Sequence, residues 1–482
     1  MVRTGFDSTG GDESDRHGHP RHRFAHVLRE RPMSTLSDAA KTLVVGLGKT
    51  GLSCARYLRS QGILTAVTDS RANPPGLRQL RDEMPEVAVF VGGFEPEVFA
   101  AAARLVVSPG VPVAEPLIQD AIARGVEVIG DVELLARAAQ APICAITGSN
   151  GKSTVTTLVG QMAAAAGQRV AVGGNLGEPA LDLLDASVER YVLELSSFQL
   201  ETTFGLRADV AVVLNVSADH MDRYPDLDAY AQTKARIYRD ARVAVVNRDD
   251  PIVAAMPRDA AIEIGFTLGE PTGSDFGLRI HEGAVWICSG QEPILPTSEV
   301  RIAGMHNLAN ALAALALIAG CGLPIGPACD VLRRFGGLPH RSELVAERDG
   351  VRWYDDSKGT NPGATVAALE GLVPPGSSGL AVLIAGGDGK GADFAPLRPA
   401  VKRAARAVVL IGRDAGLIAR ALDGEVPLVE AASMQDAVAR AATIARPGDT
   451  VLLSPACASF DMFDSYEHRG RVFAEAVRGL GT

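Results

Sequence analysis

Short apolar runs alternate with helix-like runs along most of the chain, and this alternation constrains the fold more than any other feature. The runs include "TLVVG", "ICAITG", "DVAVVLNV" and "LAVLIAGG". Strands buried between two layers of helices are almost continuously apolar, and a crossover helix usually joins each one to its parallel neighbour. The pattern therefore predicts an α/β protein with largely parallel sheets. The stretch 262–302 has shorter runs and more glycines, so we expect antiparallel strands or a meander there.

The runs fall into three blocks, at residues 34–140, 141–339 and 340–482, which we interpret as three domains. A chain of 482 residues is long enough for about that number. Residues 1–33 differ from the rest, because they are polar and hold four of the nine histidines. They contain too few apolar groups to offset the entropy of ordering the backbone, so we predict a disordered N-terminal extension.

Composition excludes several classes of protein. The formal net charge is −10, and no basic block argues for nucleic acid as a partner. No run of roughly 18 or more apolar residues is present, so we do not expect stable insertion into a membrane. The six cysteines are scattered without CxxC spacing, which favours a reduced, cytoplasmic protein. We expect small-molecule partners and a monomeric chain.

The stretch "LVVGLGKTGLS" (43–53) places Gly46, Gly48 and Gly51 in a GxGxxG between an apolar run and a helix-like run. A second apolar run, "TAVTD", ends in Asp69. In dinucleotide-binding proteins such glycines allow a tight turn close to a pyrophosphate, and the acid binds a ribose hydroxyl. The same glycines also suit any tight turn from strand to helix. The motif alone therefore does not distinguish a nicotinamide or flavin cofactor from another nucleotide.

A second glycine loop, "AITGSNGKST" (145–154), changes this interpretation. The backbone N–H groups of such a loop, together with the N-terminus of the following helix, suit a polyphosphate. Lys152 would reach the β and γ phosphate oxygens, and Ser153 or Thr154 would offer a hydroxyl to Mg²⁺. The spacing departs from GxxxxGK[ST], because position 146 is Ile. A simple dehydrogenase does not need this second phosphate loop.

Three residues farther along the chain suit a site for a metal and a nucleotide. Glu194 stands inside a run expected to be a buried strand, where a carboxylate is costly unless it is paired or binds a cation. His220 follows another strand at its carboxyl end, where open α/β sheets bind ligands. Lys234 lies on the helix that follows. His220 alone is equally consistent with a hydrogen-bonded loop histidine, and Lys234 alone with a surface lysine.

The motifs, in this order, resemble those of the Mur ligases, the ATP-dependent amide ligases that build the stem peptide of peptidoglycan. The resemblance covers residues 34–482. It rests on "GLGKTGLS", "SPG", "AITGSNGKST", "GGNLG", "LELSSFQLE", "NVSADHMDRY", "GMHNLANALAALA", "GLPHR", "DDSKGTNPGAT", "GGDGKGADF" and "SPACASFDMF". It implies a Rossmann-like N-terminal domain that binds a UDP-substrate, a central ATP-binding domain like that of P-loop ATPases, and a Rossmann-like C-terminal domain that binds an amino acid.

By this resemblance the GxGxxG turn binds UDP rather than NAD. UDP suits the turn because its pyrophosphate makes the same demands as the pyrophosphate of a dinucleotide. The implied substrate is UDP-N-acetylmuramoyl-L-alanine. Its implied contacts are Lys49, Thr50, Asp69 and Ser70 for the uracil, Arg71 and Gly110 for the pyrophosphate, and Asn175 for the sugar.

The resemblance also implies the reaction. ATP would transfer its γ-phosphoryl group to the L-alanyl carboxylate, an amino acid would attack the resulting acyl phosphate, and phosphate would leave. The implied ATP contacts are Gly148, Ser149, Asn150, Gly151, Lys152, Ser153, Thr154, Asn310, Arg341 and Asp356. The implied catalytic residues are Lys152, Glu194, His220 and Lys234. Two Mg²⁺ sites are implied, one held by Ser153, Thr154 and Glu194 and the other by His220 and Lys234, with Lys234 present as a carbamate.

The motif "DDSKGTN" favours the family members that use D-glutamate. The residues implied to bind it are Lys358, Thr360, Lys390, Ser459, Phe460 and Tyr466. Four other functions remain open from the sequence. They are another Mur ligase with a different amino acid, a Rossmann-type NAD(P)-dependent oxidoreductase, a P-loop switch or transport ATPase, and a non-catalytic regulator that binds a UDP-sugar.

Overall fold

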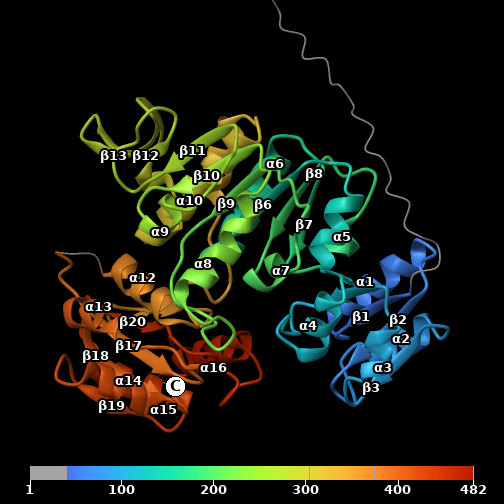
Figure 1. The fold of residues 1–482 in the computed structure, drawn as a ribbon. Coiled ribbons are helices and arrows are strands. Elements are labelled where there is room, and N and C mark those ends of the chain that lie inside the picture. The colour runs from blue at the N-terminus through green and yellow to red at the C-terminus, as the bar shows by residue number, and fades with distance from the viewer. Residues whose placement is uncertain (1–40, 303, 374–375, 481–482) are drawn as a thin grey trace, which may run out of the picture. The chain divides into compact units, whose positions relative to one another are not determined.

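The computed structural model describes residues 41–302, 304–373 and 376–480, in which the strands form three sheets (Figure 1). The predicted extension 1–33 and the first residues of the 34–140 block lie outside these ranges. The predicted α/β class with largely parallel sheets is confirmed, whereas the domain boundaries at 140 and 339 stay predictions. None of the described helices is long and apolar enough to cross a bilayer.

The first sheet has five parallel strands in the order β3-β2-β1-β4-β5. Its strands are β1 (Thr42–Val45), β2 (Thr65–Asp69), β3 (Ala88–Val91), β4 (Arg104–Val107) and β5 (Glu127–Ile129). Its helices are α1 (Lys49–Ser60), α2 (Leu77–Glu83), α3 (Pro96–Ala100), α4 (Pro116–Ala123) and α5 (Asp131–Ala138). Successive side chains of a strand point to opposite faces. Leu43 and Val45 therefore share a core with Phe99 of α3, and Val44 shares another with Leu58 of α1.

The second sheet has nine strands in the order β14-β13-β12-β11-β10-β9-β6-β8-β7. Its strands are β6 (Ile143–Thr147), β7 (Val170–Gly174), β8 (Arg190–Glu194), β9 (Val210–Val213), β10 (Val243–Asn247), β11 (Ile262–Phe266), β12 (Phe276–His281), β13 (Ala284–Ser289) and β14 (Glu292–Pro296). Its helices are α6 (Lys152–Ala165), α7 (Ser197–Glu201), α8 (Leu227–Ala235), α9 (Pro251–Ala254), α10 (Met305–Gly320) and α11 (Ile325–Arg334). Ile146 of β6 shares a core with Leu158 of α6 and Leu315 of α10.

The stretch 262–302 contains both kinds of pairing. β12, β13 and β14 form the expected antiparallel meander. β11 instead pairs in parallel with β10 along its whole length, so it extends the parallel part of the sheet. The expectation was therefore right for the last three strands and wrong for β11.

The third sheet has six strands in the order β15-β16-β20-β17-β18-β19, and β15 is antiparallel to its neighbour. Its strands are β15 (Glu343–Arg348), β16 (Val351–Asp355), β17 (Ala381–Gly386), β18 (Ala405–Ile411), β19 (Leu428–Glu430) and β20 (Thr450–Leu453). Its helices are α12 (Pro362–Leu372), α13 (Leu397–Ala404), α14 (Ala415–Leu422), α15 (Met434–Ile444) and α16 (Tyr466–Arg478). Leu383 of β17 shares a core with Leu397 of α13, and Ile384 shares another with Phe473 of α16.

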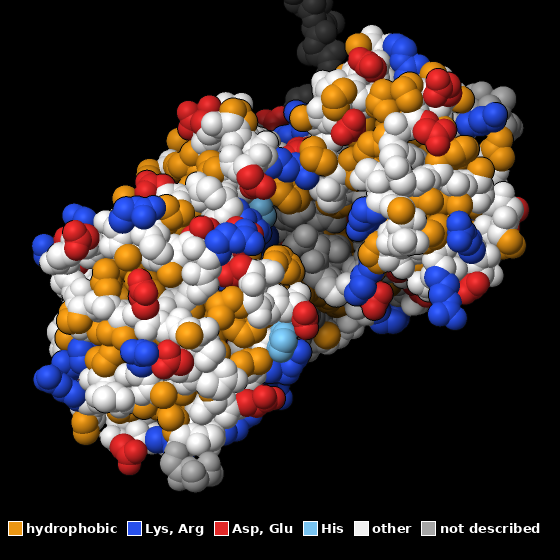
Figure 2. Space-filling view, turned by 90° about the horizontal axis from the view of Figure 1, so that it is seen from below, with side chains coloured by type: hydrophobic (Ala, Val, Ile, Leu, Met, Phe, Trp, Pro, Cys, Tyr) orange, Lys and Arg blue, Asp and Glu red, His pale blue; other side chains and the backbone are white. Residues whose placement is uncertain are grey.

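Most of the motifs follow the carboxyl ends of parallel strands, the edge at which open α/β sheets bind ligands. The first glycine loop follows β1 and the second follows β6. In the third sheet, three loops follow β16, β17 and β20. We call them the Lys358 loop (356–360), the Lys390 loop (387–391) and the Ser459 loop (454–460). On the face drawn in Figure 2, acidic and basic side chains are interspersed.

Candidate active site

The first glycine loop is shaped by Gly51 and anchored by Asp69. A Cβ atom on Gly51 would lie 1.9 Å from the carbonyl oxygen of Gly46, so only glycine lets α1 start this close to the strand. The Asp69 carboxylate accepts hydrogen bonds from the Leu47 N–H at 2.7 Å and from the Arg71 guanidinium at 2.7 and 2.9 Å. Burial alone would raise the pKa of Asp69, but these bonds hold it below its ordinary value.

The other residues predicted for the UDP-substrate lie in two places. Lys49 and Thr50 begin α1 directly after the first glycine loop, Ser70 follows β2, and Gly110 follows β4. The Ser108 hydroxyl donates to the Gly46 carbonyl at 2.9 Å and so ties the β4 loop to the glycine loop. Asn175 stands apart in sequence and follows β7 of the second sheet. Because Asp69 and Arg71 already pair with each other, a uracil or a pyrophosphate bound at these two residues would have to compete with their ion pair.

Two lysines meet at the second glycine loop. The Lys152 Nζ donates to the carbonyl oxygens of Gly148 and Ser149 at 2.8 and 2.9 Å. The Lys234 Nζ, which comes from α8, donates to the same Gly148 oxygen at 2.9 Å and lies 4.4 Å from the centroid of the Tyr230 ring. Burial lowers the pKa of Lys152. Burial and then the charge of Lys152 lower the pKa of Lys234 well below its ordinary value.

Gly151 and Ser153 connect this loop to other elements. A Cβ atom on Gly151, which has a φ of +83°, would lie 2.4 Å from the Oδ1 of Asn310 on α10. Only glycine therefore allows α10 to approach the loop this closely. The hydroxyl of Ser153 accepts a hydrogen bond from the Arg341 Nη2 at 2.7 Å. The phosphate loop is thus contacted by two of the residues predicted to bind ATP.

Glu194, at the end of β8, offers a cation site. Its side chain is buried, and its Oε1 accepts a hydrogen bond from the Asn175 Nδ2 at 2.6 Å. Its Oε2 is buried and has no hydrogen-bond partner among the described residues. A buried carboxylate oxygen without a partner is costly, and a hard divalent cation with oxygen ligands would satisfy it. The residues present therefore fit Mg²⁺. Asn175 thus contacts the predicted metal ligand, and its predicted contact with the sugar stays a prediction.

His220 lies in the loop after β9 with a φ of +58°, which is uncommon for a residue other than glycine. Its ring packs edge-on against Phe198, with 4.7 Å between the ring centroids. The Arg223 guanidinium lies 3.9 Å from the centroid of the same Phe198 ring. Burial lowers the pKa of His220 and so favours the neutral imidazole that binds metals.

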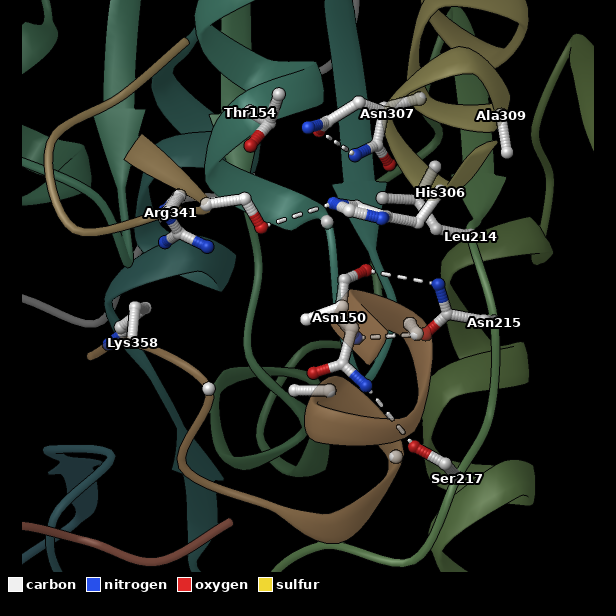
Figure 3. A pocket seen from close by; sticks show the side chains of 18 of the residues that line it. Asn150, Thr154, Leu214, Asn215, Ser217, His306, Asn307, Ala309, Arg341 and Lys358 are labelled. Carbon is white, nitrogen blue, oxygen red and sulfur yellow. Dashed lines mark hydrogen bonds between the residues drawn. The ribbon is translucent and has the colours of Figure 1, made fainter. Parts of the chain in front are cut away.

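A pocket of about 340 Å³ opens beside the phosphate loop (Figure 3). Its wall is formed by that loop, the segment after β9, the start of α10 and segments beyond residue 340. Arg341 and Lys358 lie on one side of it, and His306 and Leu214 lie on the other (Figure 3). The volume is that of a small-molecule site.

Six residues predicted to bind ATP line this pocket: Asn150, Gly151, Thr154, Asn310, Arg341 and Asp356. The buried Asp356 carboxylate accepts hydrogen bonds from the Ser454 hydroxyl at 2.7 Å and the Ser342 N–H at 3.0 Å. Burial raises the pKa of Asp356 to about 7. Asn310 donates its Nδ2 to the Oδ1 of Asn307 at 3.2 Å.

The residues predicted to bind D-glutamate come from the three loops of the third sheet and from α16. The Lys358 Nζ lies 4.1 Å from the centroid of the Tyr466 ring, and burial lowers the pKa of Lys358 to about 8. Ser459 is 2% exposed, whereas Phe460 is 69% exposed. Thr360 is half-buried, and Lys390 is exposed. Backbone hydrogen bonds join the loops. The Ala456 N–H donates to the Gly359 carbonyl at 2.9 Å. Ala458 and Asp388 each donate an N–H to the other's carbonyl, at 2.8 and 3.0 Å.

Sequence reasoning missed a set of asparagine side chains around Asn150. Asn361 caps α12, and its Nδ2 donates to the Asn150 Oδ1 at 3.2 Å and to the Asp219 Oδ2 at 3.1 Å. The Asn215 Oδ1 accepts a hydrogen bond from the Asn150 N–H at 2.8 Å. Asn361 stands inside the motif "DDSKGTNPGAT" and Asn215 inside "NVSADHMDRY". Their position in these motifs was the signal that could have identified them.

Sequence models of three domain families match the chain. They are the Mur ligase MurD-like N-terminal domain at residues 40–130, the Mur ligase middle domain at 146–318 and the Mur ligase glutamate ligase domain at 340–457. A protein of Marinobacter nauticus named UDP-N-acetylmuramoylalanine--D-glutamate ligase is 56% identical over 93% of this chain and 100% of its own length. A Pseudomonas aeruginosa protein of the same name is 54% identical over 93% of this chain and 100% of its own length.

Two solved structures show the same fold. MurF from Acinetobacter baumannii aligns with a TM-score of 0.57 at 18% identity and covers 91% of this chain and 92% of that one. UDP-N-acetylmuramate-alanine ligase MurC from Thermotoga maritima aligns with a TM-score of 0.54 at 18% identity and covers 91% of this chain and 99% of that one.

Proposed function

This chain belongs to the Mur ligase family, and we propose that it is the ATP-dependent ligase that adds D-glutamate to UDP-N-acetylmuramoyl-L-alanine in peptidoglycan biosynthesis. Relatives of that name that are 54 and 56% identical over nearly the whole chain support the proposal. The assignment also accounts for both glycine loops, one for UDP and one for ATP. An NAD(P)-dependent oxidoreductase would leave the second loop without a use.

The observation that carries the proposal is the pocket in which the phosphate loop faces Arg341 and Lys358. Activation of a carboxylate by ATP brings two anions together, so neutralisation of their charge dominates the barrier. Lys152 and Arg341 are two cations that contact this loop. In our proposal both turn from their present hydrogen bonds toward the phosphate oxygens as ATP binds.

Mg²⁺ is the second source of positive charge, and we propose that Glu194, Ser153 and Thr154 hold it beside the ATP phosphates. When bound, it would act as a Lewis acid on the transferring phosphoryl group. The unpartnered Oε2 of Glu194 supports this position, because a cation would satisfy it. We propose His220 and Lys234 as ligands of a second metal ion.

We propose that Lys234 becomes a carbamate. An ammonium group would repel a metal ion, whereas a carbamate offers the oxygen ligands that Mg²⁺ prefers. Carbon dioxide adds only to a neutral amine. The pKa of Lys234, which shares the Gly148 carbonyl with Lys152, is lowered by burial, and this shift favours the neutral form.

In our proposal the UDP-substrate and the amino acid bind to different parts of the chain. We propose that the residues around the first glycine loop, with Asn175, bind the UDP-substrate. Lys358, Thr360, Lys390, Ser459, Phe460 and Tyr466 would bind D-glutamate. A diacid needs cationic or N–H donors at both carboxylates, and Lys358 and Lys390 are the candidates. We propose the cytoplasm as the compartment, since all six cysteines are free thiols.

The test is phosphate release from ATP in the presence of UDP-N-acetylmuramoyl-L-alanine, screened over amino acids of both hands. D-Glutamate is expected to give the fastest release, and no release is expected without an amino acid. Faster release with L-alanine, L-lysine or meso-diaminopimelate would assign the chain to another member of the family. Steady hydrolysis without any amino acid would indicate a P-loop ATPase instead.

A further inference from the structure

Arg469 is a buried arginine that the proposed mechanism does not use. It stands in the first turns of α16 and is 0% exposed. Burial lowers its pKa to about 10, so its guanidinium stays charged at neutral pH. A buried charge is costly unless its N–H groups are well satisfied. The hydrogen-bond partners of Arg469 therefore indicate the role of its buried charge.

The hydrogen bonds of Arg469 end on two of the three loops of the third sheet. Its Nε donates to the Ser357 hydroxyl at 2.9 Å, and its Nη2 donates to the Ser357 carbonyl at 2.7 Å. Its Nη1 donates to the Cys457 carbonyl at 3.1 Å. Ser357 immediately precedes Lys358, and Cys457 lies two residues before Ser459. The planar, rigid fork of the guanidinium therefore sets the spacing between these two loops.

The surrounding contacts leave the fork little freedom. The Ser357 hydroxyl also donates to the Tyr466 carbonyl at 2.8 Å, which ties the loop to the start of the helix that carries Arg469. Ala456 adopts a φ of +59°, in the left-handed region that is costly for a residue with a Cβ atom. Its N–H donates to the Gly359 carbonyl at 2.9 Å. The two loops thus meet in a constrained arrangement beside the arginine.

We infer that Arg469 is a positioning residue for the amino-acid substrate. It holds Lys358 and Ser459 at the separation that a bound amino acid needs, without contacting the amino acid itself. The inference rests on the proposed function, in which these two loops bind the amino acid. It goes beyond that function because it assigns the geometry of the subsite to a residue outside it.

The test is Arg469→Lys, which keeps the positive charge and loses the fork. A lysine has a single nitrogen and cannot bond to both loops in the same way. We expect the KM for the amino acid to rise on the order of tenfold, because misplaced binding groups lose much of their effect. The KM values for ATP and the UDP-substrate should stay within about twofold, since no hydrogen bond of Arg469 reaches their residues. Ser357→Ala, which removes one of the three acceptors, should raise the same KM by a smaller factor.

The matched control is Arg190→Lys. Arg190 is also buried and also bonds through three nitrogens, to Gln168, Asp209 and the Cys321 carbonyl, outside the proposed site. It should lower the melting temperature without changing any KM. Equal changes in all three KM values, or unchanged amino-acid KM in both Arg469→Lys and Ser357→Ala, would overturn the inference.

Hydrogen–deuterium exchange gives a readout that does not depend on the substrate. Amides of the Lys358 and Ser459 loops should exchange faster in Arg469→Lys than in the wild type, and they should be unchanged in Arg190→Lys. Unchanged exchange in both loops would overturn the inference. If the wild-type enzyme prefers another amino acid, the D-glutamate assignment fails, and the KM values are then compared with the preferred amino acid.

Discussion

At the scale of single residues, Lys234 carries the sharpest expectation. It is 1% exposed and donates to the Gly148 carbonyl beneath the phosphate loop. If it serves as a carbamate, Lys234→Ala removes a metal-holding anion, and activity should fall by orders of magnitude. Acetate or propionate should restore part of the activity by placing a carboxylate in the vacated space.

The control for this rescue is Lys402→Ala, because the Lys402 side chain is 70% exposed and pairs with Glu425. It should keep full activity and show no response to acetate. Near-normal activity of Lys234→Ala would exclude the proposed role. Loss of activity without rescue, together with an unmodified lysine in a density map at high bicarbonate, would make Lys234 a structural residue.

Lys358 predicts a pH dependence. Burial lowers its pKa to about 8, so it is a cation below that pH and a neutral amine above it. A neutral Lys358 cannot pair with a substrate carboxylate, so the KM for the amino acid should rise as pH increases from 7 to 9. Arg keeps its charge throughout this range. We therefore expect the wild-type KM divided by the Lys358→Arg KM to rise with pH. The ratio is used because the titration of the substrate amine affects both KM values and cancels. A ratio that does not change with pH would contradict this role of Lys358.

Single residues were predictable where a motif states the chemistry. The motif "AITGSNGKST" predicts that Lys152 is a phosphate ligand, and Glu194 is conspicuous as an acid inside an apolar run. The same reasoning could not predict that Asn175 bonds to Glu194, because Asn175 follows β7 and Glu194 ends the neighbouring strand β8. Nor could it predict Arg469, whose two partner residues, Ser357 and Cys457, lie 112 and 12 residues away in sequence.

At the scale of elements, α16 and α15 allow a paired prediction. Ser465 caps α16 and Ser433 caps α15, and each hydroxyl accepts a hydrogen bond from the backbone N–H three residues later at 3.2 Å. Replacing either serine by alanine should cost about 1 kcal/mol of stability. Only α16 carries Tyr466 and Arg469. Ser465→Ala should therefore raise the KM for the amino acid, whereas Ser433→Ala should lower the melting temperature alone. Equal changes in the KM for the amino acid in both variants would contradict a specific role of α16 in binding the amino acid.

Most elements were visible in the sequence because their length and apolarity match the strands of parallel sheets. β19, at Leu428–Glu430, is too short to give an apolar run of its own. β11 was misread because two of its five residues, Ile262 and Glu263, are exposed and its run resembles the meander that follows. The parallel pairing of β11 with β10 is determined by tertiary contacts, which the local sequence pattern does not show.

At the scale of the whole molecule, Asp131 links stability to pH. It is buried at the start of α5, where its Oδ2 accepts a hydrogen bond from the Gln199 Nε2 of α7 at 3.1 Å. Its Oδ1 has no hydrogen-bond partner among the described residues. Burial raises the pKa of Asp131 from 3.8 to about 6. The folded chain therefore holds this proton more tightly than the unfolded chain does.

The sign of the effect follows from this raised pKa. The stability contributed by the protonated form is fully present below about pH 4 and is lost as pH rises through about 6. A shift of this size corresponds to about 3 kcal/mol between those limits. Asp131→Asn cannot ionise, so its melting temperature relative to the wild type should rise by several degrees between pH 4.5 and 7.5. Asp436→Asn is the control, because the half-buried Asp436 has a lowered pKa and is ionised throughout this window. Melting curves of the three proteins at four pH values measure the effect, and parallel curves for wild type and Asp131→Asn would refute it.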